Sequence, residues 1–173
     1  KTRRWLLFSS VSDMVSVTLI AVGKIKEKYL REALDEYAKR LSAYCKFEVV
    51  EVKDEKTPDS PSTREKQLVL EKEGERISAK IPQGAAVVSL CVEGKQMTSK
   101  RFAELISGYS IRGISKIAFI IGGSFGLDEK IKALSDVRLS FSEMTFPHML
   151  MRVILAEQLY RGFTITEGKT YHK

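Results

Sequence analysis

The chain has 173 residues, of which 43% are hydrophobic, and this size is typical of one compact domain with a substantial core. It contains no apolar run of the roughly 18 residues that a membrane span needs, which argues against a membrane protein and leads us to expect a cytoplasmic one. The formal net charge of +7 indicates a polyanionic partner such as a nucleic acid, without specifying which.

The chain divides into a short leading segment and one folded domain. Residues 1–13 precede Met14, which opens a strand-like segment at once, so we interpret them as an extension outside the fold. Over residues 14–173, short β-branched runs alternate with amphipathic stretches, the pattern of an α/β domain with a mostly parallel sheet and helices on both faces. Strands are predicted at residues 15–22, 47–52, 85–92 and 117–121, and within 136–142.

Helices and loops are predicted between these strands. Apolar residues recur at three- and four-residue spacing among charges over residues 30–44, which predicts a helix with one buried stripe. Capping residues at 62–63 and 98–99 predict the starts of two further helices. Residues 54–62 contain two prolines and are a candidate loop or lid, with a solvated connector as the alternative. Residues 93–95 are predicted to form a turn.

The last helix is the most informative element by pattern alone. Pro147 suits its first position and Gly162 its exit, which predicts a helix of about 15 residues. Apolar side chains cover almost its whole circumference, so we expect it to be buried on more than one side. The second partner could be another subunit or a different layer of the same chain. Arg152 and Arg161 point in opposite directions on this helix and therefore cannot share one role.

The two cysteines, Cys45 and Cys91, form no C-x-x-C pair and have no histidines clustered near them. A disulfide framework or a zinc site is therefore not supported. We expect two buried free thiols and no bound metal.

A glycine-rich turn, GGSFG at residues 122–126, follows a strand and precedes a helix. Its backbone N–H groups could receive an anionic or polar ligand, although glycine also serves for tight turns in any α/β protein. It has neither the lysine of a P-loop nor the spacing of a dinucleotide fingerprint, so it supports neither ATP hydrolysis nor a dinucleotide site. His148 and His172 are the only histidines and no G-x-S-x-G elbow exists, which argues against a catalytic triad.

Several segments taken together resemble one known family. The run SFSEMTF at residues 140–146 precedes a proline, a histidine and a long helix, and the chain ends in Tyr-His-Lys. LIAVGK at residues 19–24 and KEGER at residues 72–76 match the same family. The combination is similar to the ribosomal RNA large subunit methyltransferase H family, a minimal branch of the SPOUT superfamily, over residues 14–173.

The resemblance implies a carboxyl-terminal trefoil knot, a pocket for S-adenosyl-L-methionine made by the knotted loops, and a homodimer whose active site uses both subunits. It also implies N3 methylation of a pseudouridine in 23S ribosomal RNA, within the assembled ribosome. The cofactor-binding positions that it implies are Leu90, Gly122, Phe141, Ser142, Glu143, Met144, Thr145 and Phe146. The candidates for binding and orienting the nucleotide at the catalytic centre are Arg161, His148, Tyr171 and His172.

Methyl transfer to an imide nitrogen asks little of side chains, because the protein has to align the reactants, assist proton loss and exclude water. For Arg161 the alternative is a structural salt bridge with Glu157, and for the tail it is a disordered end.

Two other functions remain open. A non-catalytic module that binds RNA or ribosomes would explain the charge, and cofactor binding would exclude it. A nucleotide-binding oxidoreductase with Glu143 as its ribose-binding acid is disfavoured, because the glycine turn falls late in the chain with the wrong spacing.

Overall fold

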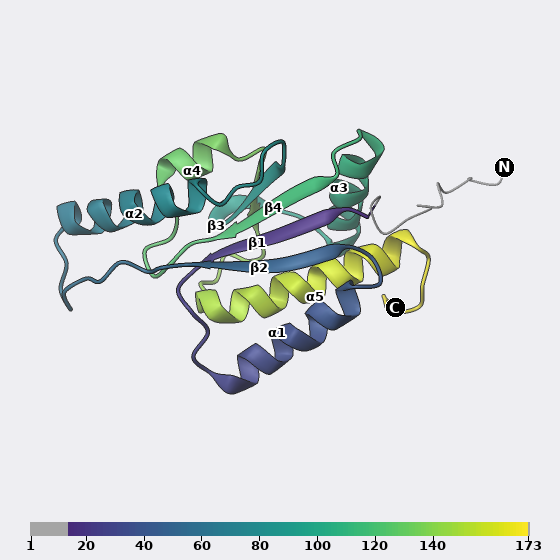
Figure 1. Cartoon of the computed structure of the whole chain (residues 1–173), viewed down its shortest axis with the longest axis horizontal. Coiled ribbons are helices and arrows are strands. Elements are labelled where there is room, and N and C mark those ends of the chain that lie inside the picture. The colour runs from purple at the N-terminus through teal and green to yellow at the C-terminus, as the bar shows by residue number, and fades with distance from the viewer. Residues whose placement is uncertain (1–13, 173) are drawn as a thin grey trace.

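The structure is a computed structural model that describes residues 14–172. It contains a parallel five-stranded sheet in the order β2-β1-β4-β3-β5, with helices on both faces, as the sequence predicts (Figure 1). The segment 1–13, interpreted above as an extension, lies outside the described residues. The elements are β1 (Ser16–Val22), α1 (Lys28–Leu41), β2 (Lys46–Val52), α2 (Thr63–Ser78), β3 (Ala86–Gln96), α3 (Ser99–Ile111), β4 (Lys116–Ile121), α4 (Glu129–Leu134), β5 (Val137–Ser140) and α5 (His148–Thr166).

Two helices begin at capping side chains that the sequence supplies. The Ser62 hydroxyl accepts a hydrogen bond from the Glu65 N–H, and the Glu65 carboxylate accepts one from the Ser62 N–H, which completes a capping box at the start of α2. Thr98 caps α3 by accepting from the Arg101 N–H. These caps satisfy N–H groups that the first helical turn leaves without partners. Both helix starts agree with the sequence prediction.

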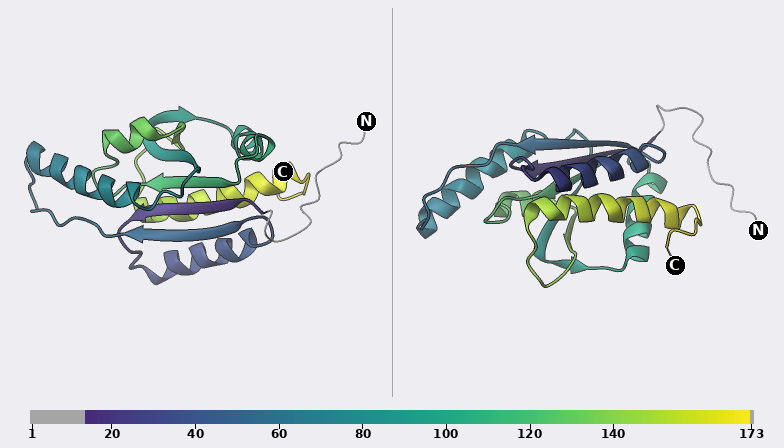
Figure 2. Two further views of the ribbon diagram at one scale, coloured as in Figure 1. Left: turned by 45° about the horizontal axis from the view of Figure 1, so that its top comes forward. Right: turned by 90° about the horizontal axis from the view of Figure 1, so that it is seen from below.

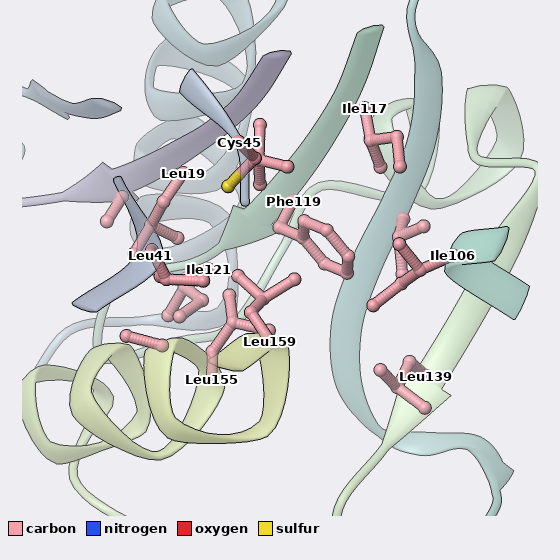
Figure 3. Packing of buried hydrophobic residues seen from close by; sticks show 14 of the residues in the cluster. Leu19, Leu41, Cys45, Ile106, Ile117, Phe119, Ile121, Leu139, Leu155 and Leu159 are labelled. Carbon is pink, nitrogen blue, oxygen red and sulfur yellow. The ribbon is translucent and has the colours of Figure 1, made fainter. Parts of the chain in front are cut away.

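Alternate side chains of the central strands face opposite layers of the fold. Leu19 and Phe119 point into a large core with α1, α3 and α5, whereas Ile20 and Ile120 belong to a smaller core with α2 and α4. Figure 3 shows the large core, in which Leu155 of α5 lies beneath the sheet. Because both faces are covered, β1 and β4 are continuous apolar runs rather than alternating ones.

The end of α5 differs from the sequence prediction. The pattern predicts an exit at Gly162, but the helix continues to Thr166 with Gly162 inside it. A Cβ on Gly162 would lie 3.3 Å from Ile106 Cδ1 and 3.6 Å from Ala103 Cα, so the glycine permits the close approach of α3. Packing between two helices, rather than helix termination, therefore explains this glycine.

The turn predicted at residues 93–95 is also wrong, because these residues belong to β3. The strand bulges after Leu90 and pairs with β5 again at Lys95. A Cβ on Gly94 would lie 2.6 Å from the carbonyl carbon of Leu139, so glycine is required where the two backbones pass each other.

The two cysteines have different environments. Cys45 lies in the large core, and burial raises the pKa of its thiol to about 12. Cys91 is only partly buried, so the prediction of two buried thiols is correct for Cys45 alone. Both thiols are free, in agreement with the prediction that no disulfide forms.

The orientation of α5 relative to the sheet matters for the site. All strands run parallel, so their carboxyl ends share one edge, and α5 begins at that edge and runs beneath the sheet to the opposite one, where the chain ends (Figures 1 and 2). The first and last residues of α5 are consequently far apart. The trefoil knot that the family resemblance implies stays a prediction.

Candidate functional site

A cavity of about 700 Å³ lies at the carboxyl ends of β4 and β5 and beside the bulge of β3. Open α/β sheets bind their ligands at this edge, and small-molecule sites generally have volumes of about 300–1,000 Å³. The lining consists of strand ends, the glycine turn and the loop before α5. It comprises residues 90–93, 121–127, 139–142 and 144–148, together with Lys132 and Met151.

The glycine turn forms one wall of this cavity and is tightly closed. A Cβ on Gly122 would lie 2.1 Å from the carbonyl oxygen of Gly126, a distance that no side chain can tolerate. Gly126 donates its N–H to the carbonyl of Gly123 at 3.1 Å and has a φ of +87°. The turn therefore depends on glycine at both ends, and the backbone itself lies against the cavity.

The loop between β5 and α5 forms the opposite wall. At its base, the Ser140 hydroxyl donates to the carbonyl oxygen of Ser142, and the Ser142 hydroxyl accepts from the Met144 N–H at 3.0 Å. The ring of Phe141 packs edge-on against Phe102. Met144 is 71% exposed. The base of the loop is thus fixed, while its tip presents apolar side chains that a ligand could cover.

The structure brings most of the expected cofactor positions together. The cavity is lined by Leu90, Gly122, Phe141, Ser142, Met144, Thr145 and Phe146. Glu143, also expected from the resemblance, is exposed and is not among the lining residues. Of the candidate catalytic residues, only His148 lies at this cavity.

An ion pair on the cavity rim was not foreseen from the sequence. Lys132 of α4 pairs with Glu93 of β3 and with Glu129, the latter at 2.8 Å. The hydrogen bond from Lys132 holds the pKa of Glu93 below its ordinary value, so this carboxylate is charged at the edge of the cavity. No local pattern reveals the Glu93 pair, because its two residues lie far apart along the chain and the sequence predicted a turn at Glu93.

His148 and Arg152 lie on one stripe of α5, as the helical spacing predicts. Arg152 is fully buried, and its guanidinium donates to the carbonyls of Val22 and Gly23 at 2.6 and 3.0 Å and to Glu51 at 3.0 Å. Burial, together with the nearby Arg152 charge, lowers the pKa of His148. The imidazole beside the cavity is therefore neutral at physiological pH and can accept a proton.

Arg161 belongs to a different cluster, at the other end of α5. Its Nε and Nη2 donate to Glu157 Oε1 at 2.9 and 2.5 Å, which is the salt bridge considered as the alternative. Its guanidinium also lies 4.8 Å from the ring centroid of Tyr171, and its Nη1 is 3.4 Å from His172 Nδ1. Tyr171 packs edge-on against Tyr160 of the helix. Arg161, Tyr171 and His172 therefore form one cluster, whereas His148, the fourth candidate catalytic residue, lies apart from it at the cavity.

The two ends of α5 are separated by a distance that follows from helix geometry. With a rise of 1.5 Å per residue, the thirteen steps along the helix from His148 to Arg161 span about 20 Å. The structure therefore confirms that Arg152 and Arg161 have different surroundings. It also places the Arg161 cluster far from the cavity of the same chain.

The described residues contain neither a metal-binding cluster nor a membrane-spanning helix. No group of three or more His, Cys, Asp or Glu side chains within residues 14–172 is arranged to hold a metal ion. No helix in this part of the chain is long and apolar enough to cross a membrane.

Comparison with known proteins defines the class. The chain matches the family model described as predicted SPOUT methyltransferase over residues 15–172, so it belongs to the SPOUT methyltransferase family. A ribosomal RNA large subunit methyltransferase H of Streptococcus pyogenes serotype M5 is 52% identical over 92% of this chain and 100% of its own length. A Methanococcus maripaludis protein that carries the same name provisionally is 55% identical over the same shares. The chain is therefore a member of the ribosomal RNA large subunit methyltransferase H family within that class.

Solved structures show the same fold at low sequence identity. A probable methyltransferase from Bordetella pertussis Tohama I superposes with a TM-score of 0.54 at 12% identity, covering 89% of this chain and 99% of that one. A probable methylase family protein from Haemophilus influenzae gives a TM-score of 0.53 at 12% identity, covering 91% of this chain and 70% of that one. At these identities the likeness supports the fold alone.

Proposed function

We propose that this chain transfers a methyl group from S-adenosyl-L-methionine to large-subunit ribosomal RNA, and that the acceptor is N3 of a pseudouridine in 23S ribosomal RNA of the assembled ribosome. The observation that carries the proposal is the cavity at the carboxyl ends of β4 and β5 and beside the bulge of β3, in a chain 52% identical to a ribosomal RNA large subunit methyltransferase H. Such a protein would act in the cytoplasm, where ribosomes are.

The lining of the cavity fits this cofactor. Leu90, Phe141 and Phe146 offer apolar surface for an adenine ring, and backbone groups of the closed glycine turn can approach a ligand without side chains in the way. The charged Glu93 carboxylate suits the cofactor's hydroxyl or ammonium groups. Bound S-adenosyl-L-methionine would supply an electrophilic methyl group on a sulfonium centre.

Proton loss from the acceptor nitrogen is the step in which a side chain can assist. His148 is half-buried at the cavity, and its lowered pKa keeps it neutral, so it can accept a hydrogen bond or a proton. Burial raises the pKa of Tyr171 to about 12, so this phenol stays protonated and can donate. We assign His148 to the methyl-transfer centre and Tyr171, with Arg161 and His172, to the orientation of the nucleotide.

This division requires a second subunit. The Arg161 cluster lies about 20 Å along α5 from His148, too far to contact a nucleotide at the cavity of the same chain. The apolar side chains of Leu150, Val153 and Ile154 on α5 are only partly buried, which leaves a surface for a partner. In a twofold homodimer that pairs these helices in antiparallel orientation, the cluster of one subunit would meet the cavity of the other.

The Glu157 salt bridge limits the donors that the Arg161 guanidinium can offer in such a site. Glu157 accepts from Nε and from one N–H of Nη2, which leaves the second N–H of Nη2 and both N–H groups of Nη1, the nitrogen near His172, to donate to a phosphate or a carbonyl of the RNA. Glu157 is therefore the group that orients Arg161. The salt bridge and the proposed role in RNA binding are compatible.

Two measurements test the proposed activity. Calorimetric titration with S-adenosyl-L-methionine should show binding, and ribosomes from cells lacking the enzyme should gain one methyl group, which mass spectrometry of the digested RNA would place on the pseudouridine. Ribosome binding without cofactor binding would instead indicate a non-catalytic module. Heat with NADH and none with S-adenosyl-L-methionine would indicate an oxidoreductase.

A further inference from the structure

A second cavity, of about 940 Å³, lies at the carboxyl ends of β1 and β2, beside the first. The two cavities share the wall formed by residues 123–125 and His148. The rest of the second lining comes from the ends of β1 and β2, the connection from β1 to α1, the loop after β2, two residues of α2 and Met149 of α5. A ligand in the second cavity would therefore lie directly beside the reacting centre proposed above.

The free charges of the second cavity are mainly positive. Its lining includes Lys24, Lys26, Lys53 and Lys56, all exposed, and none of their ammonium groups is within 4.0 Å of a carboxylate in the described residues. Two of the acidic residues in the lining, by contrast, are already paired. Glu51 binds Arg152, and Glu55 binds both Lys72 and Arg76. Four cations thus face Asp54 and Glu73 as the remaining carboxylates.

The segment that carries Lys24 and Lys26 is held in place by its backbone. Arg152 donates to the carbonyl of Gly23 at 3.0 Å, and Glu51 accepts from the Ile25 N–H at 3.2 Å. Arg31 donates to the carbonyl of Ile25 at 2.8 Å. These bonds fix the chain on both sides of Lys24 and leave the lysine side chains free for a ligand.

The loop that carries Lys53 and Lys56 is fixed in a similar way. Arg76 Nη1 donates to the carbonyl of Lys53 at 2.9 Å. Glu73, only 5% exposed, accepts from the Glu55 N–H at 2.9 Å. The backbone that carries each lysine pair is therefore held in place by hydrogen bonds. Less conformational entropy is lost when these lysines bind an anion than would be lost on a mobile loop.

We propose that this lysine-lined cavity binds the phosphate backbone of the RNA strand that flanks the target nucleotide. The inference rests on the proposed function and adds the site that holds the strand. Four unpaired cations around one cavity are suited to a polyanion. The glycine turn between the cavities lacks the lysine of a mononucleotide-binding loop, which argues against a mononucleotide as the ligand. A strand lying in this cavity would present its next base to the shared wall at His148.

Two double variants test the proposal, Lys24→Ala/Lys26→Ala and Lys53→Ala/Lys56→Ala. The matched control is Lys46→Ala/Lys80→Ala. Lys46 begins β2 and Lys80 precedes β3, so both lie near the amino ends of the strands, away from the cavities. Both are exposed and unpaired in the described structure. The unmodified chain and these three variants would be titrated with unmethylated ribosomes at several salt concentrations and, separately, with S-adenosyl-L-methionine.

Each cavity variant should bind ribosomes about tenfold more weakly and lower the slope of log affinity against log salt by about 1.4, since a single-stranded phosphate contact contributes about 0.7. Cofactor affinity should not change, and the loss in methylation should appear in KM rather than kcat. Cavity variants that match the control in affinity and slope would overturn the proposal. A second result would also overturn it: the unmodified chain binds ATP in the micromolar range, and the cavity variants lose this ATP binding while their ribosome affinity stays unchanged. Failure of the unmodified chain to methylate ribosomes would refute the proposed function instead.

Discussion

Replacing Arg152 by methionine tests the role of the buried guanidinium most sharply. The substitution keeps much of the side-chain volume but removes the donors to the carbonyls of Val22 and Gly23 and the partner of Glu51. Breaking a buried ion pair by removing one partner costs about 3–5 kcal/mol. The Glu51 side chain is 32% exposed, so water offsets part of this cost. We therefore expect a loss near the lower limit, about 3 kcal/mol in the free energy of unfolding.

For a chain of this length, such a loss should lower Tm by about 6–12 °C. Urea unfolding and thermal unfolding, followed by circular dichroism at one fixed protein concentration, would measure it. The matched control is Arg161→Met on the same helix, where an i,i+4 pair with Glu157 contributes about 0.5 kcal/mol. The reasoning fails if Arg152→Met is no less stable than this control.

Two further predictions concern Gly123, in the wall between the cavities, and Glu73, which lies next to it. A Cβ at position 123 would lie 2.9 Å from Glu73 Oε2 and 3.1 Å from Val22 Cγ1. Gly123→Ala should therefore lower the free energy of unfolding by about 1–3 kcal/mol and weaken cofactor binding. A folded variant whose cofactor affinity, measured by calorimetry, is unchanged would contradict this. Burial raises the pKa of Glu73, so the stability that its protonated form contributes is fully present below the unfolded pKa and is lost as pH rises through the folded pKa. Glu73→Gln should therefore be more stable than the unmodified chain at neutral pH, an advantage that should vanish below about pH 4; a constant difference across pH would exclude this cause.

Local features were predictable from the sequence. The starts of α2 and α3 depend on Ser62 and Thr98, whose capping chemistry acts within three residues. The opposite directions of Arg152 and Arg161 follow from helical spacing alone, and the structure places them in separate clusters. The cavity residues of the loop before α5 came from the family resemblance rather than from periodicity.

Features that depend on tertiary contacts were not predictable. Gly162 resembles a helix exit until α3 is placed against it, and residues 93–95 resemble a turn until β5 passes beside Gly94. The pairing of Lys132 with Glu93 joins segments that only the fold brings together. The hydrophobic pattern of a helix likewise does not reveal which other element, or which other subunit, covers it.

Complementation within a heterodimer tests the central claim, that one active site combines the cavity of one subunit with the Arg161 cluster of its partner. Arg161→Ala would remove the cluster from one chain. Thr145→Arg, which places a cation in the exposed loop of the cavity, would remove cofactor binding from the other, as calorimetry must first show. Co-expression with two affinity tags would isolate dimers that contain one chain of each kind.

Such a dimer has one site in which both contributions are intact, so it should methylate ribosomes at about half the rate of the unmodified dimer, while each parent homodimer is nearly inactive. A heterodimer no more active than its parents would contradict the shared site.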